Sequence, residues 1–200
     1  MSRGQPAPER TREIEQARAD TRLIVRLGAL MLLIYLAHVF HHLGNGTSDE
    51  LLWMCNVAAA LLVIGCITQN DHACAIPLLW LSVGTPLWII DALAGGEVIP
   101  TGILTHFGGL VISALAVRRL GMPRGTWYRA MGLAAAVVAI CRLDTPPALN
   151  VNLAHAVQRG WESRFESHLR YLGLLFAIGL VTCFVVERLA RRLLVRPALR

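Results

Sequence analysis

The sequence predicts an all-α, polytopic membrane protein with six transmembrane helices. Of its 200 residues, 55% are hydrophobic and the mean hydropathy is +0.53, which is too apolar for an ordinary soluble domain. The apolar residues gather in six stretches, each close to the ~20 residues that a helix needs to cross ~30 Å of hydrocarbon. The fourth and sixth stretches are slightly short, so flanking residues must complete those crossings. The six stretches are 23–43, 51–68, 74–93, 102–117, 127–143 and 171–186.

The positions of the arginines predict that both termini are cytoplasmic. All 19 basic residues are Arg; six precede or open the first stretch, four lie between the fourth and fifth, and five follow the sixth. The loops at 44–50 and 94–101 contain none, and the positive residues of a membrane protein gather on its cytoplasmic side. The connection between the fifth and sixth stretches carries four more Arg, but it is long, and long loops weigh less in orientation.

This distribution also divides the chain and limits its partners. Residues 1–22 form a charged cytoplasmic extension without the features of a cleavable signal peptide, and 188–200 form a basic cytoplasmic tail. Between them lies the membrane domain, 23–187, with a long outer loop at 144–170. The net charge of +6 predicts contact with anionic lipid rather than nucleic acid. We expect a multi-pass protein of a bacterial inner membrane, with lipid as environment and possible substrate; neither a cofactor nor an oligomeric state is predicted.

Polar residues inside the apolar stretches fall near one face of the bilayer. With the N-terminus inside, odd-numbered stretches run outward and even-numbered ones inward, which places all of these residues toward the outer side. Because polar and ionisable groups are costly in a membrane, a one-sided cluster of them is a candidate site. The cluster comprises Cys55, Asn56, Asp91, His106 and the triplet His38, His41 and His42.

The depths of Cys55 and His106 predict that the two side chains can meet. Thr47 and Glu50 have the spacing of a capping box, so we expect the second helix to begin there. At ~1.5 Å per residue, Cys55 then lies ~12 Å below this cap. His106 lies ~7.5 Å below Thr101, which opens the fourth stretch, by the same rise. The two meet if the second and fourth helices are neighbours.

A thiol and an imidazole at one depth predict a nucleophile and its base. Cys55 would form a thiolate, His106 would accept its proton, and Asp91 or Asn56 would orient the imidazole. Simpler interpretations stay open. Cys55 could be a small buried apolar residue or form a disulfide with Cys141, and Asp91 could end its helix or pair with Arg142.

Two further interpretations concern the same face of the membrane. His38, His42, His106 and Asp91 include an i, i+4 histidine pair and a carboxylate, as a metal ion requires. Alternatively, the protein is a non-catalytic membrane partner whose polar residues tie helix ends together. The outer loop contributes Asn150 and Asn152, which, with His38 and His42, we expect to face lipid or substrate. This loop is either a lid or a passive interfacial segment.

Three segments resemble the YwaF-type family of six-helix integral membrane proteins. They are the Cys55 segment Leu-Leu-Trp-Met-Cys-Asn, the His106 segment Leu-Thr-His-Phe-Gly, and Asn150 with Asn152 after the fifth stretch. The resemblance covers roughly residues 25–190. The family's eukaryotic relatives include an acyltransferase that moves polyunsaturated acyl chains onto ether phospholipids. The resemblance implies that Cys55 accepts an acyl group and that His106 is the general base; the histidine triplet and the segment 84–91 depart from the family pattern.

Overall fold

The structure, a computed structural model, describes residues 7–96 and 98–194, and all regular structure in this part of the chain is helical. Seven α-helices are joined by short turns, by one π-helical turn (η2) and by 3₁₀ turns (the other η elements). In chain order the elements are α1 (Ala7–Gly44), η1 (Ser48–Leu52), α2 (Met54–Thr68), α3 (Asp71–Leu93), α4 (Pro100–Ile103), η2 (Leu104–Gly108), α5 (Gly109–Leu120), α6 (Thr126–Asp144), η3 (Pro147–Leu149), η4 (Val151–Leu153), η5 (Glu162–Arg164) and α7 (His168–Leu193).

Five helical segments in the described part of the chain are long and apolar enough to cross a membrane. They are Ile14–Gly44, Asp71–Leu93, Pro100–Leu120, Thr126–Asp144 and His168–Leu193. The remaining apolar helix is α2. It has 15 residues and is therefore only ~22 Å long, which is short of the ~30 Å thickness of a hydrocarbon core. Each apolar stretch of the sequence thus forms a helix. The chain has the architecture of an integral membrane protein, in which α2 is the short member.

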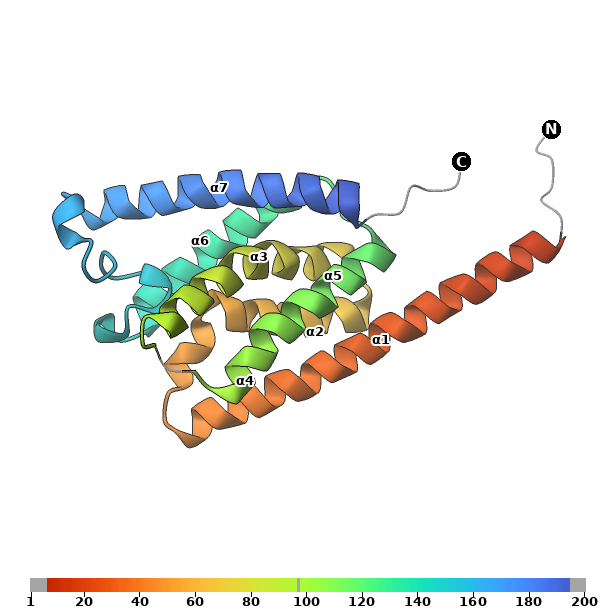
Figure 1. The fold of residues 1–200 in the computed structure, drawn as a ribbon, viewed down its shortest axis with the longest axis horizontal. Coiled ribbons are helices and arrows are strands. Elements are labelled where there is room, and N and C mark those ends of the chain that lie inside the picture. The colour runs from red at the N-terminus through yellow and green to blue at the C-terminus, as the bar shows by residue number, and fades with distance from the viewer. Residues whose placement is uncertain (1–6, 97, 195–200) are drawn as a thin grey trace.

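Helix α3 lies at the centre of the bundle, in contact with α2, α5, α6 and α7 (Figure 1). Helix α1 packs against α2, α4 and α5 on one side, while α7 lies beside α6 on the other (Figure 1). The start of α1 and the end of α7 lie toward the same end of the bundle, and the long connection between α6 and α7 lies at the opposite end (Figure 1). Helix α1 extends back from the first apolar stretch to Ala7, and residues 11, 12 and 14–19 of this charged part are exposed.

The bundle is apolar outside as well as inside. Phe40 on α1, Leu87 on α3 and Val181 on α7 are each 60% exposed or more. A soluble protein rarely leaves so many large apolar side chains uncovered, whereas a bilayer covers them. The exposed faces of the long helices therefore match the environment predicted from the sequence.

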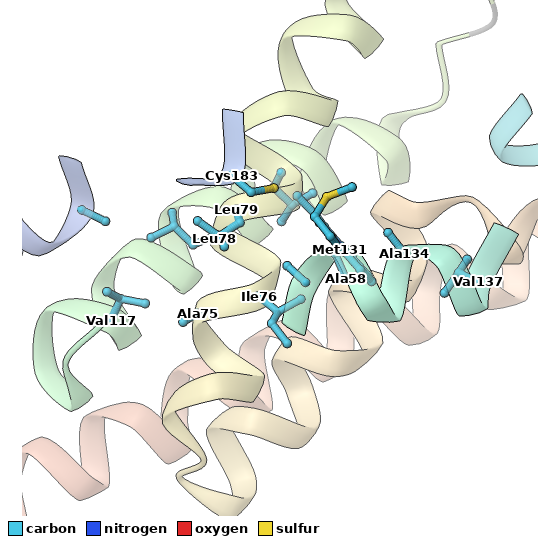
Figure 2. Packing of buried hydrophobic residues seen from close by; sticks show 14 of the residues in the cluster. Ala58, Ala75, Ile76, Leu78, Leu79, Val117, Met131, Ala134, Val137 and Cys183 are labelled. Carbon is cyan, nitrogen blue, oxygen red and sulfur yellow. The ribbon is translucent and has the colours of Figure 1, made fainter. Parts of the chain in front are cut away.

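The buried core is built from small and medium side chains around α3. Figure 2 shows Leu78 and Leu79 of α3 near Met131 of α6 and Cys183 of α7, all of them buried. Glycines bring the helices close: a Cβ on Gly109 would lie 2.9 Å from the Leu81 side chain. Such small-residue contacts are the usual means of helix association where lipid removes the hydrophobic driving force.

Candidate functional site

A buried hydrogen-bond network joins three helices at the bundle end opposite the start of α1 and the end of α7 (Figure 1). His38 of α1 is 3% exposed, and its Nε2 lies 3.0 Å from Oδ1 of Asn56 on α2. Its Nδ1 lies 3.0 Å from Oγ1 of Thr101 on α4. His42 is one turn further along α1, and its Nε2 atom lies 3.2 Å from the Nε2 atom of His38. The sequence predicted His38, His42 and Asn56 at one end of the bundle, and the structure brings them into contact.

The partners of this network fix where its protons lie. The Asn56 amide nitrogen donates to the Glu50 carbonyl (2.9 Å), so Oδ1 faces His38 as an acceptor and His38 Nε2 carries a hydrogen. The Thr101 hydroxyl then donates to His38 Nδ1. The Thr47 hydroxyl donates to the His42 carbonyl, so it accepts from His42 Nδ1–H at 2.8 Å. With this arrangement the lone pair of His42 Nε2 faces the hydrogen of His38 Nε2.

The capping box predicted for Thr47 and Glu50 does not form. Thr47 makes no side-chain cap hydrogen bond, because its hydroxyl is used by His42. Residues 48–52 form the 3₁₀ turn η1, and α2 begins only at Met54. The predicted depth of Cys55, two turns into a helix, is therefore wrong. Cys55 is the second residue of α2 and lies in its first turn.

The Cys55 thiol faces the central helix. A Cβ on Gly84 of α3 would lie 2.7 Å from Cys55 Sγ, so the sulfur rests directly against the glycine. Cys55 is partly buried and is free, as is Cys141, and the disulfide considered between them does not form. Cys141 instead receives a hydrogen bond from the Asn152 side chain (3.2 Å).

His106 lies in the π-helical turn η2, which interrupts the helix from Pro100 to Leu120. Single π turns inside α-helices occur often at functional sites. His106 Nδ1 lies 2.8 Å from the Gly102 carbonyl, which can only accept, so Nδ1 carries the hydrogen and the neutral ring has its lone pair on Nε2. The ring stacks on Trp88 of α3, with centroids 4.7 Å apart and planes inclined by 18°. The orienting role expected of Asp91 or Asn56 thus falls to Gly102 and Trp88.

Cys55 and His106 are placed by consecutive turns of one helix. Gly84 and Trp88 are four residues apart, so they lie on one face of α3, ~6 Å apart along its axis. The helices that carry the pair are neighbours, since α2 contacts both η2 and α5. The described residues include no hydrogen bond between Cys55 and His106. His106 Nε2 has no partner among the hydrogen bonds of the described chain.

The long loop at 144–170 is tied to the start of α2 by Asn152. Its side chain accepts from Met54 N (2.8 Å) and donates to the Leu52 carbonyl (2.7 Å), which bridges the break between η1 and α2. Asn150 closes the loop on itself by accepting from the backbone of His155 and Ala156 (3.0 and 2.9 Å). Both asparagines adopt positive φ, a conformation that this residue type tolerates. These side-chain hydrogen bonds organise the loop.

Within the described part of the chain, Asp91 forms no hydrogen bond or ion pair with the other predicted site residues. It is exposed in the last turn of α3, where its carbonyl accepts from Gly96 N (2.9 Å). It does not pair with Arg142, which donates to the Ala154 carbonyl (2.7 Å) instead. Across residues 7–96 and 98–194 no three His, Cys, Asp or Glu side chains gather as they would around a metal ion.

Three residues of the site were not singled out from the sequence. Thr101 completes the His38 network, Gly84 receives the Cys55 sulfur, and Trp88 stacks on His106. The spacing of Gly84 and Trp88 by four residues, at the end of a helix that carries Asp91, was the available signal. No protein-family model, no curated protein and no solved structure matches the chain.

Proposed function

We propose that this integral membrane protein transfers or hydrolyses lipid acyl groups, with Cys55 as the nucleophile and His106 as the base. The supporting observation is that Cys55 and His106 rest on adjacent turns of α3, and that the lone pair of His106 is on the unpartnered Nε2. In this proposal the six helices all cross the membrane, and both termini are cytoplasmic. The likeness to YwaF-type proteins agrees with it in the roles of both residues.

The chemistry needs only these two side chains and an ester. His106 Nε2 accepts the Cys55 proton while the sulfur attacks the ester carbonyl of a phospholipid. The carbon–oxygen bond breaks, the lysolipid oxygen takes the proton back from His106, and the acyl group remains on Cys55 as a thioester. An acceptor hydroxyl, from another lysolipid or from water, then gives its proton to His106 and attacks the thioester. The product is an ester or a free acid, and the thiol is restored.

The helix dipole at Cys55 and the apolar surface around the pair are the features of the surroundings that favour this chemistry. Cys55 is in the first turn of α2, where the helix dipole favours a negative charge. Exposed apolar side chains flank the pair, including Leu87 beside Trp88 and Phe107 beside His106. The site therefore lies among surfaces that acyl chains cover, near the end of the bundle.

The test is transfer of an alkyne-tagged acyl chain from phosphatidylcholine to the purified protein in detergent. We expect a tag that neutral hydroxylamine removes, because a thioester is cleaved under these conditions. Cys55→Ala should abolish the tag, and His106→Ala should slow its appearance by roughly 10²–10⁴, the usual contribution of a general base. Cys66→Ala is the matched control on the same helix. Equal tagging of wild type and Cys55→Ala would exclude the proposal.

A second candidate is a non-catalytic membrane protein whose polar end serves only to join helices. It is favoured by the closure of the network around His38, which leaves no donor of that imidazole unpaired. In that case no acyl group is ever found on Cys55. His38→Ala would then change stability alone.

A further inference from the structure

A groove of about 330 Å³ opens at the opposite end of the bundle, between the start of α6 and the end of α7. Its charged lining consists of Arg124, Arg188, Arg191 and Glu187, and its apolar walls include Trp127 and Phe184. This is the end to which the topology brings the arginine-rich segments. The groove thus combines a cluster of guanidinium groups with the apolar surface of two long helices.

The acidic residue of the groove is already bound to backbone groups. Glu187 is 4% exposed, and its two carboxylate oxygens accept from Gly125 N (3.1 Å) and Trp127 N (2.9 Å). A side chain of α7 therefore caps the start of α6, and the positive end of that helix is satisfied from within the protein. The helix start itself is not available to a ligand.

Among the residues that the structure describes, the three arginines of the groove form no ion pair. Apart from a contact between His42 and Glu50, the ion pairs of the described residues are Asp20 with Arg119 and Glu166 with Arg170. The Arg188 guanidinium lies over the Phe184 ring, 4.9 Å from its centroid, which holds it beside an apolar surface. Guanidinium groups match the oxygens of a phosphate in geometry and charge.

We propose that this groove binds the phosphate of an anionic phospholipid, with the acyl chains lying along Phe184 and Trp127. A lipid fits better than a soluble phosphate, because the arginines adjoin apolar helix surface at the level where the bundle ends. Basic pockets between membrane helices are a known type of headgroup site. The site is independent of the proposed acyl chemistry, which lies at the other end of the bundle.

The test is titration of the purified full-length protein, in dodecylmaltoside, with dioleoylphosphatidylglycerol, followed by native mass spectrometry. We expect the double variant Arg188→Gln with Arg191→Gln to weaken lipid binding about thirtyfold, and the single variant Arg124→Gln to weaken it about fivefold. Each arginine near an anionic headgroup contributes about 1 kcal/mol to binding, which corresponds to about fivefold in affinity. The matched control is Arg129→Gln with Arg192→Gln, which removes equal charge at the same end but outside the groove. It should weaken binding less than about threefold, because neither side chain lines the groove and both are exposed, where solvent and salt screen a charge.

Two companion titrations distinguish the source of the phosphate. Dioleoylphosphatidylcholine should bind at least about tenfold more weakly than the glycerol lipid, because its headgroup has no net charge. Inorganic phosphate at millimolar concentration should neither raise the melting temperature nor displace the lipid. Equal weakening by both double variants, equal binding of the two lipids, or displacement by inorganic phosphate would each overturn the proposal.

Discussion

The two ends of the bundle both bury polar groups, but they satisfy them differently. At the end that carries the candidate site, two imidazoles, a hydroxyl and an amide bond to one another around His38. At the arginine end, the Glu187 carboxylate is satisfied by two backbone N–H groups. Side chain-to-side chain bonds can be exchanged for bonds to a substrate or lost one at a time. A carboxylate committed to a helix start fixes two helices together, so we assign the larger contribution to stability to that end.

The largest effect should follow from Glu187→Ala. Without the carboxylate, two N–H groups at the start of α6 lose their acceptors, and we expect a loss of about 3 kcal/mol in unfolding free energy. Glu187→Gln keeps the volume and one acceptor, so about half of this loss is expected. The measurement is unfolding by sodium dodecyl sulfate in mixed micelles. A loss below ~0.5 kcal/mol for Glu187→Ala would remove the contrast between the two ends.

The next effect should come from Gly84→Ala. The added Cβ meets Cys55 Sγ at 2.7 Å, so α2 and α3 must separate or the sulfur must turn away. Overpacking of this kind costs about 1–3 kcal/mol, and acyl tagging of Cys55 should fall with it. Gly132→Ala is the control, since a Cβ there meets nothing within 4 Å, and it should stabilise α6 slightly. Unchanged tagging in Gly84→Ala would mean that the contact does not position the thiol.

A smaller effect is expected from His38→Ala. Its removal leaves Thr101 and His42 without their partner, and hydrogen bonds between membrane helices contribute about 1–2 kcal/mol at most. The control is His41→Ala on the same helix, whose ring is hydrogen-bonded to Asn45 and lies edge-on to the His42 ring but forms no hydrogen bond within the His38 network. That change should stay within about 0.5 kcal/mol in the same unfolding measurement. Equal losses in both variants would show that the buried network is not what joins these helices.

The smallest effect should be that of Asp91→Asn. Asp91 is exposed, and the hydrogen bonds that end α3 use its carbonyl rather than its carboxylate. We expect a change within about 0.5 kcal/mol and unaltered tagging of Cys55.

Treatment of the wild type with EDTA should likewise leave its melting temperature unchanged. A lower melting temperature after EDTA, restored by zinc, would bring back the metal site predicted from the sequence.

The helices could be predicted from the sequence, because a bilayer forces each crossing to be a long apolar run. The start of α2 could not. It depends on Asn152, whose side chain bonds to Met54 N from a position 98 residues away. Thr101 was missed for the same reason, since its partner His38 is 63 residues distant. The sequence shows Glu187 as an acidic residue among arginines. It does not show that the partners of this carboxylate are backbone N–H groups at the start of α6.

The central claim is that His106 activates Cys55, and the rate of Cys55 alkylation tests it most directly. N-ethylmaleimide is applied to the purified protein in detergent, and peptide mass spectrometry follows each cysteine separately. Cys141, a buried thiol at the same end, serves as the internal reference. We predict that His106→Gln slows the reaction of Cys55 at least about tenfold relative to Cys141, because the base no longer accepts the thiol proton. An unchanged ratio would contradict the claim.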